Sequence, residues 1–343
     1  MTAPLLHVRE LKKHFTISKG GFLRGDPVVV HAVDGVSFEL ERGETRSIVG
    51  ESGSGKSTVG RAILSLYKPT SGEIRVDGTR IDKLNVRELL KMRRKVQVIF
   101  QDPFSSLNPR MRIREILAEP LRNFGIARSN AEIDACVAEL LERVRMPVDS
   151  AKRFPHEFSG GQRQRIGIAR ALAPKPDLIV CDEAVSALDM SVKAQIVNLL
   201  QDLQDDMGLA LLFISHDMAI VEHVSHRVAV LYLGKVVEIG PRRQLFAMPK
   251  HPYTRSLLSA IPVADPRRIL NRVPLRGEIP SPVNPPSGCL FHTRCPLVHD
   301  RCRVEEPVLQ PVAGAHMAAR HHERHRDEVH RNHRRHLVQN AGQ

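Results

Sequence analysis

The stretch Gly50-Glu51-Ser52-Gly53-Ser54-Gly55-Lys56-Ser57-Thr58 decides the fold. Apolar residues precede it at 48–49 and follow it over 59–66, which places the glycines at a turn between a strand and a helix. In that context the backbone N–H groups and the helix N-terminus can bind phosphates. Lys56 would reach the phosphate oxygens, and the Ser57 hydroxyl would bind Mg²⁺. The alternative is a glycine-rich surface turn, which requires neither a lysine nor a hydroxyl. The residues of this loop predicted to hold a nucleotide are Gly50, Ser52, Gly53, Gly55, Lys56, Ser57 and Thr58.

Around this loop, strand patterns alternate with helix patterns, which predicts an α/β domain with a largely parallel sheet. Residues 113–124 and 131–144 read as two amphipathic helices without a strand between them, so a helical subdomain is expected over about 102–160. Strands are expected at 5–15, 28–40, 45–49, 74–76, 96–100, 178–181 and 209–215, with a hairpin at 227–237 and a turn at 18–27. Helices are expected at 84–94, 113–124, 131–144, 161–173 and 192–207.

Composition indicates a cytosolic chain of one large domain with an appendage. Its 343 residues are 42% hydrophobic, yet no apolar run approaches the roughly 20 residues of a membrane span. The net charge of +13 suggests an acidic partner, but residues 320–336 hold six Arg and six His against only three acidic residues, so the folded part is less basic than the total suggests. With 4% aromatic residues and no Trp, a base-stacking surface for nucleic acid is not expected.

The region after His251 has a different character. Prolines at 252, 262, 266, 274, 280, 282, 285 and 286 argue against a long helix or a central strand, so an ordered but irregular extension is expected. The predicted organisation is a core domain over 1–250, a proline-rich C-terminal extension over 251–319, and a basic tail over 320–343 that is expected to be disordered.

Two further segments carry chemistry. The apolar run 178–181 ends in Asp182 and Glu183, which predicts that Asp182 holds Mg²⁺ and that Glu183 polarises or deprotonates the attacking water. Two solvating acids after a strand are the alternative. Ser159-Gly160-Gly161-Gln162 opens a helix whose free N–H groups could bind another phosphate.

The segment Phe158-Ser159-Gly160-Gly161-Gln162-Arg163-Gln164-Arg165 resembles the signature sequence of ATP-binding-cassette (ABC) ATPases. That resemblance implies a RecA-like parallel core with an antiparallel edge and an inserted helical subdomain. It also implies that two such domains pair head to tail. The residues Ser159, Gly160, Gly161 and Gln162 would then close on ATP that the partner's phosphate loop holds.

Four other positions are similar to that family's pattern. The resemblance makes Gln101 a sensor of Mg²⁺ and the attacking water, His216 a switch at the γ-phosphate, and Asp189 part of a loop between the two sites. It places Phe15 against the adenine ring. Taken alone, Gln101 could cap a strand, His216 could be a solvated turn residue, and Phe15 could belong to the core. Ala184 stands where the family usually has proline, from which a slightly looser turn is expected.

Residues 101–110, His251-Pro252-Tyr253-Thr254 and the segment 277–289 resemble the ATP-binding subunits of dipeptide and oligopeptide importers, in particular the second of their two ATPases. This implies ATP and Mg²⁺ as cofactors and a place at the cytoplasmic membrane face. The implied partners are a second ATPase, two permeases and, through the complex, a peptide-binding protein. A nickel-chelate or glutathione importer, or a soluble ABC ATPase acting on nucleic acid, is the alternative.

Three cysteines lie in the extension. Cys289, Cys295 and Cys302 could hold a [4Fe-4S] cluster, which usually takes four thiolates. Where the resembling family carries a fourth cysteine, this chain has Arg320. Three readings stay open: a histidine ligand (His316, His321 or His322), a cluster with an open position, or no cluster. Cys136 and Cys181 are expected in the core.

Overall fold

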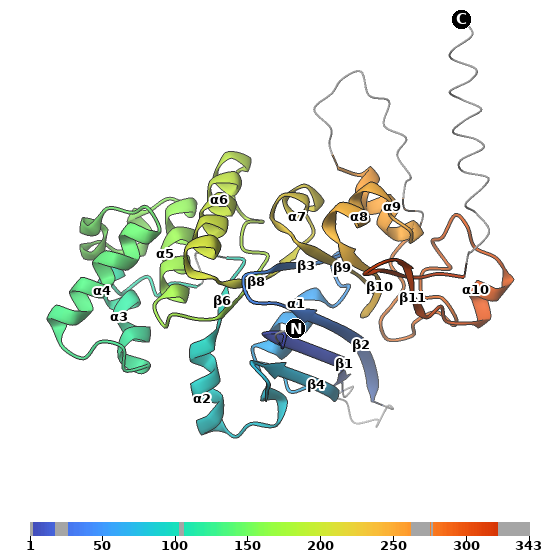
Figure 1. The fold of residues 1–343 in the computed structure, drawn as a ribbon, viewed down its shortest axis with the longest axis horizontal. Helices are drawn as coiled ribbons and strands as arrows, with labels where there is room; N and C mark the ends of the chain where they lie inside the picture. Colours follow the sequence, from blue (N-terminus) through green and yellow to red (C-terminus); the bar gives the residue numbers. More distant parts are fainter. Residues whose placement is uncertain (1–2, 18–26, 103–105, 262–274, 276, 322–343) are drawn as a thin grey trace, which may run out of the picture.

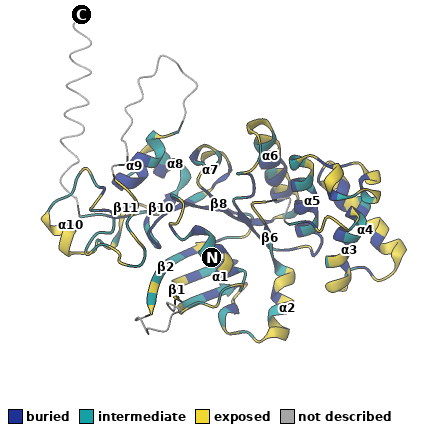
Figure 2. Cartoon of the chain, turned by 180° about the vertical axis from the view of Figure 1, so that it is seen from behind, coloured by how far each residue is buried: buried dark blue, intermediate teal, exposed yellow. Residues whose placement is uncertain are grey.

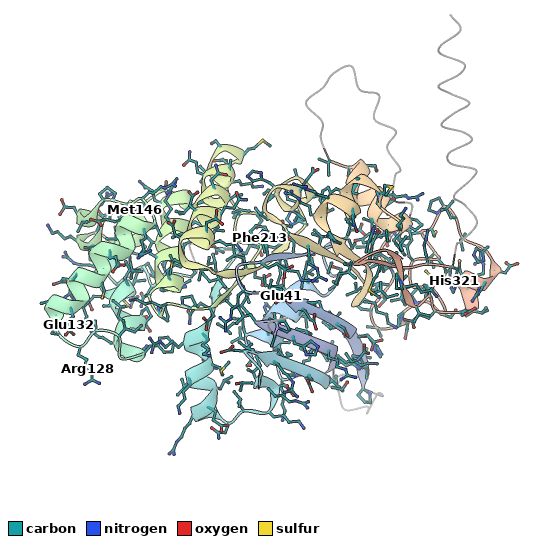
Figure 3. The ribbon with its side chains drawn as sticks, viewed as in Figure 1. Glu41, Arg128, Glu132, Met146, Phe213 and His321 are labelled. Atoms are coloured by element: carbon teal, nitrogen blue, oxygen red, sulfur yellow. The ribbon has the colours of Figure 1, made fainter. Side chains whose placement is uncertain are left out.

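The computed structural model describes residues 3–17, 27–102, 106–261, 275 and 277–321. It is an elongated α/β molecule with two sheets in its middle, the helices α3 and α4 at one end, and α10 at the other (Figure 1). In Figure 3, Met146 marks the helical end, Phe213 the middle and His321 the opposite end. Among the described residues no helix combines the length and apolarity that crossing a membrane requires.

The main sheet has eight strands in the order β11-β12-β10-β9-β3-β8-β7-β6. The strands from β9 to β6 are parallel, whereas β10, β12 and β11 extend the sheet antiparallel. Every residue of β3, β7 and β8 is buried, as expected for parallel strands covered on both faces. Their bounds are β3 Thr45–Val49, β6 Val96–Ile99, β7 Leu178–Asp182, β8 Ala210–Ser215, β9 Arg227–Tyr232, β10 Lys235–Pro241, β11 Leu309–Ala313 and β12 His316–Ala319. The predicted α/β fold with a parallel core and an antiparallel edge is confirmed.

A second, antiparallel sheet has the order β2-β1-β4-β5. Its strands are β1 Leu6–Ile17, β2 Val28–Leu40, β4 Ser71–Val76 and β5 Thr79–Arg80. The helix α1 (Lys56–Ile63) lies between the two sheets, where Val59 and Ile63 share one apolar cluster with Val8 of β1 and Ile48 of β3. This packing fixes the N-terminus of α1 at the carboxyl edge of the main sheet.

Most of the remaining helices leave their outer faces exposed, while the central strands β3, β7 and β8 of the main sheet are buried (Figure 2). The five predicted helices are present within a few residues. The structure adds α7, which the sequence pattern missed because seven residues are too few to show a period. Asp217 caps it by accepting hydrogen bonds from the N–H groups of Ala219 and Ile220. The bounds are α2 Val86–Lys95, α3 Ile113–Asn123, α4 Asn130–Arg143, α5 Gly160–Leu172, α6 Met190–Met207, α7 Met218–Val224, α8 Arg242–Ala247, α9 Pro252–Ser259 and α10 Asp300–Val304.

The expectation of an irregular extension is wrong in part. The extension forms α9, α10 and the β11–β12 hairpin, and β12 pairs with β10 through Glu238↔Ala318 and Ile239↔Met317. Pro311 sits in β11, the edge strand, where a missing N–H is tolerated. The hairpin therefore continues the main sheet. The predicted turn at 18–27 and the basic tail fall mostly outside the described residues.

A buried carboxylate ties the extension to the sheet. Glu238 is 0% exposed and accepts hydrogen bonds from the N–H groups of Lys250 and His251, both at 2.8 Å. Its Oε1 also lies 2.6 Å from Nε2 of His316. Burial raises the pKa of Glu238, but the hydrogen bonds from His316 and the two N–H groups outweigh it and hold that pKa below its ordinary value.

The buried histidine at the start of α9 predicts a pH-dependent stability. His251 is 2% exposed, its Nδ1 accepts a hydrogen bond from the Tyr253 N–H, and burial lowers its pKa to about 4. Below pH ~6.5, His251 binds a proton in the unfolded chain but not in the folded chain. The free energy of unfolding should therefore fall by up to about 3 kcal/mol between pH 6.5 and pH 4. In His251→Asn, which keeps an acceptor at this position, thermal unfolding at pH 7 and pH 5 should show a smaller difference. An equal pH dependence in both proteins would contradict this role.

Candidate functional site

The phosphate loop joins β3 to α1 in a conformation that only glycine allows at two positions. Gly55 has φ of +100° and is the last residue of the loop, directly before Lys56, where α1 begins. A Cβ atom on Gly55 would lie 2.2 Å from the carbonyl oxygen of Ala32, and one on Gly50 would lie 2.3 Å from that of Leu231. Ser52 and Gly53 are exposed, so the loop is packed against the core at both ends and open to solvent between them.

The Lys56 side chain lies inside this loop. It is 4% exposed, and Nζ donates hydrogen bonds to the carbonyl oxygens of Gly50 (2.9 Å) and Glu51 (2.8 Å). Burial lowers the pKa of Lys56, while the charges of Glu183, Asp182 and Glu51 oppose that shift. Two backbone carbonyl oxygens thus hold the charged end of Lys56 inside the loop, where a bound phosphate would need a cation.

The carboxyl end of β7 brings an acid to the start of α1. The Ser57 hydroxyl donates a 2.8 Å hydrogen bond to Oδ1 of Asp182, which is 9% exposed. Burial raises the pKa of Asp182, opposed by the hydrogen bond from Ser57 and the charges of Arg61 and Lys56. A hydroxyl and a carboxylate in contact form an oxygen donor set that suits Mg²⁺. These two residues fit the ion that the sequence predicts.

Glu183 occupies a strained position beside His216. Its φ is +52°, which is uncommon for a residue other than glycine, and its N–H donates to the Ile214 carbonyl at 3.0 Å. Oε1 of Glu183 lies 3.4 Å from Nδ1 of His216, which follows the neighbouring strand β8. The Glu183 side chain is 17% exposed and that of His216 is 55% exposed. A carboxylate that is partly shielded from water and backed by an imidazole can serve as a general base.

Gln101 and Phe15 are less closely tied to this group. In the pairing of β6 with β7, Ile99 lies opposite Cys181. Gln101 and Glu183 each follow two residues later, so both lie at the same edge of the sheet. Gln101 is exposed. Phe15, in β1, is half-buried, its ring is edge-on to Tyr67 at 5.2 Å, and Lys13 Nζ lies 4.8 Å from its centroid. Both the adenine contact and the packing interpretation of Phe15 stay predictions.

The predicted signature residues lie at an exposed helix N-terminus. The Ser159 hydroxyl accepts from the Gln162 N–H at 3.3 Å, and the Gln162 side chain accepts from the Ser159 N–H at 3.0 Å, so they form a capping box for α5. Both residues are exposed, as is Asp189 at the start of α6. A Cβ on Gly161 would lie 2.4 Å from Val192. Gly160 and Gly161 thus open α5 close against α6.

Sequence reasoning missed Gln164. It is 1% exposed, and its amide donates to the carbonyl oxygens of Ala184 (2.6 Å) and Phe100 (3.5 Å). The signature helix is thereby bonded to the loop after Glu183 and to the strand end before Gln101. A polar residue on the same helical stripe as Ile168 and Ala171 was the available signal.

The three cysteines of the extension lie in one folded segment, but their sulfur atoms are not all within 4.8 Å of one another. Cys302 is buried and the other two are half-buried; the Cys289 N–H donates to the Cys302 carbonyl at 2.9 Å. Burial, together with smaller contributions from the charges of Cys302 and Cys295, raises the pKa of Cys289 to about 11. Thiols with raised pKa values are protonated unless a metal compensates their charge.

Histidines near these cysteines differ in what they contact. His316 is bonded to Glu238 at the sheet, which argues against it as a fourth ligand. His321 Nε2 contacts the Glu305 carbonyl at 2.8 Å, beside α10, and His322 lies outside the described residues. Within the described part of the chain, the one group of three or more His, Cys, Asp or Glu ligand atoms within 4.8 Å is His14, His31 and Asp34. In that group Lys12 and Lys235 already pair with Asp34.

Comparison with known proteins finds two family models on this chain. Residues 33–186 match the model described as ABC transporter, and residues 237–302 match the one described as oligopeptide/dipeptide transporter, C-terminal region. A probable peptide ABC transporter ATP-binding protein of Sinorhizobium fredii is 55% identical over 321 residues, 94% of this chain and 90% of the relative. The oligopeptide transport ATP-binding protein AppF of Bacillus subtilis is 50% identical, over 92% of this chain and 97% of its own length.

Solved structures agree with the fold. CbiO1 of Clostridium perfringens, described as part of an ABC transporter complex, has a TM-score of 0.62 at 27% identity, covering 72% of this chain and 92% of its own. The dimeric cassette MJ0796, described as a post-hydrolysis state bound to ADP and Pi, has a TM-score of 0.60 at 31% identity, covering 69% and 99%. Both likenesses cover more than two thirds of this chain.

Proposed function

The chain belongs to the ABC transporter ATPases, in the group that carries an oligopeptide/dipeptide transporter C-terminal region, and we propose that it energises the import of short peptides by hydrolysing ATP. ATP hydrolysis is supported by one observation: two pairs of polar side chains lie at the same edge of the main sheet. Ser57 is bonded to Asp182, and Glu183 lies beside His216, next to the loop that holds Lys56.

Each of these residues has a distinct role in hydrolysis. The loop N–H groups and Lys56 bind the β- and γ-phosphates, and Ser57 and Asp182, with Gln101 at the same edge, hold Mg²⁺. Bound Mg²⁺ neutralises charge on the phosphate oxygens. Glu183 orients the attacking water and accepts its proton, while His216 positions that carboxylate and contacts the γ-phosphate. Phe15 stacks on the adenine.

The site is completed by a second ATPase. Ser159, Gly160, Gly161, Gln162 and Asp189 are at or near the exposed N-termini of α5 and α6, where they can contact ATP bound to a partner. The similar cassette MJ0796 is described as a dimer, which supports this arrangement. Two permeases and an external peptide-binding protein would complete the transporter at the cytoplasmic membrane face, and no nucleic acid is needed. Through the bonds of Gln164, closure on ATP would move Gln101 and the helical subdomain, proposed at about 102–160, against the permeases.

Co-purification tests the partners. The tagged full chain, expressed in its native host and extracted in mild detergent, should retain two membrane permeases and a second ATPase. Recovery of salt-sensitive nucleic acid in place of permeases would contradict the proposed function.

We also propose that Cys289, Cys295 and Cys302 hold a [4Fe-4S] cluster. Their place in one folded segment, where the Cys289 N–H donates to the Cys302 carbonyl, supports this. Burial raises the pKa of Cys289 and of Cys295, so the positive charge of bound iron would be needed to keep their sulfurs as thiolates. Of His316, His321 and His322, His321 is the candidate for the fourth ligand, because His316 is bonded to Glu238 and His322 lies outside the described residues.

Anaerobically purified protein is expected to contain about four iron atoms per chain with matching sulfide, by metal and sulfide analysis. Cys295→Ser should lose that iron, whereas Cys136→Ser, in α4, should retain it. Absence of iron and sulfide from the wild-type protein would contradict the cluster.

A further inference from the structure

Glu51, the second residue of the phosphate loop, is bonded to the C-terminal extension through both its side chain and its backbone. Arg294 donates from Nη1 to Oε2 at 2.6 Å and from Nη2 to Oε1 at 3.1 Å, which is a bidentate pair. The Glu51 N–H donates a 2.7 Å hydrogen bond to the Tyr253 hydroxyl. These partners come from a segment 243 residues further along the chain and from α9.

This contact is partly shielded from water, since the Glu51 side chain is 25% exposed. Arg294 is 6% exposed and Tyr253 is 0% exposed. The rings of Tyr232, Tyr253 and Phe291 pack on one another with centroids 4.8 to 5.5 Å apart, and the Arg294 guanidinium lies 5.9 Å from the Tyr232 centroid. The pairing with Glu51 raises the pKa of Arg294. An exposed ion pair contributes little to the free energy of folding. A bidentate Arg–carboxylate pair packed against aromatic rings instead restricts the conformations of both side chains.

The third polar group of Glu51 faces the catalytic lysine. Its carbonyl oxygen accepts from Lys56 Nζ at 2.8 Å and from the Ser54 N–H at 3.2 Å. When Lys56 binds a phosphate, its Nζ can no longer donate to the loop carbonyls of Gly50 and Glu51, so the loop loses these two hydrogen bonds. The bonds from Arg294 and Tyr253 reach Glu51 from the extension and do not depend on Lys56, so they can hold the loop while its lysine is engaged elsewhere.

We propose that Arg294 and Tyr253 are positioning residues for ATP hydrolysis, which hold the phosphate loop, through Glu51, in the shape that binds nucleotide. This rests on the ATPase function proposed above. The extension is then part of the nucleotide site. Because Arg294 directly precedes Cys295, the fold of the cysteine segment determines where its guanidinium lies, and therefore how the loop is held.

The test uses the full chain in its assembled transporter, with ATP turnover measured over a range of ATP concentrations. Glu51→Gln, Arg294→Lys and Tyr253→Phe should each lower kcat/KM by roughly ten- to hundredfold, mostly through a higher KM, because a charge-assisted or buried hydrogen bond is lost. Arg301→Met is the matched control: Arg301 pairs with Glu305 in the same extension but is exposed, and its loss should leave KM unchanged.

A double-mutant cycle separates positioning from general stability. Glu51→Gln combined with Arg294→Met should lose little more than either change alone, because both remove the same interaction. Additive losses would overturn the proposal, as would lower melting temperatures with a wild-type KM. If the Arg294 variants misfold, the other two variants still test the proposal. Tyr253→Phe removes only one hydroxyl, and Glu51→Gln changes no residue of the extension. If the wild-type transporter did not hydrolyse ATP, the proposed function would fail instead.

Discussion

Replacing Glu183 with glutamine is expected to slow steady-state ATP hydrolysis by roughly 10²- to 10⁴-fold, the usual contribution of a general base. Glutamine matches the size of the side chain but cannot accept a proton from water. Asp182, Ser57 and Lys56 are untouched, so ATP should still bind with close to wild-type affinity.

Phosphate release by the reconstituted transporter measures this effect. Glu222→Gln provides the matched control, since Glu222 is an exposed glutamate on α7 and its change should leave turnover at the wild-type rate. Turnover that is unchanged in Glu183→Gln would contradict the role of Glu183 and the assignment of this sheet edge as the hydrolytic site.

Lys56→Met should weaken ATP binding by roughly ten- to hundredfold, and hydrolysis should fall at least as far. The substitution keeps the apolar stem, but it removes the cation that now bonds to the carbonyls of Gly50 and Glu51. A hydrogen bond to a charged group is worth about 1.5 to 3 kcal/mol, which sets the expected loss of affinity.

Equilibrium binding of a fluorescent ATP analogue to the assembled transporter measures that affinity directly. Lys68→Met, at an exposed lysine just beyond α1, should bind the analogue as the wild type does. Wild-type affinity in Lys56→Met would show that phosphate recognition does not depend on this loop.

Much of the core could be predicted because burial leaves a local pattern. β2 and β3 were expected at the bounds that the structure has, since each is a β-branched or apolar run. The meeting of Asp182, Glu183 and His216 with the phosphate loop also follows from the sequence. They end or follow the neighbouring parallel strands β7 and β8, and β8 pairs with β3.

What could not be predicted depends on contacts between distant segments. The β11–β12 hairpin is recognisable only through its pairing with β10, because Pro311 and the shortness of the strands hide the strand pattern. The Arg294–Glu51 pair spans 243 residues and has no local signature at all. Gln164 did carry a signal, a polar side chain in a buried helical stripe, but its two carbonyl partners come from the tertiary fold.

Uptake of a labelled short peptide into proteoliposomes tests the proposed transport function most directly. The vesicles would hold the full transporter, with ATP on the side of this chain and peptide with its binding protein on the other. We expect peptide to accumulate with wild-type protein and to remain at background with Glu183→Gln. Equal accumulation by the two proteins, or none with a range of di- and oligopeptides despite active ATP hydrolysis, would contradict peptide import driven by this ATPase.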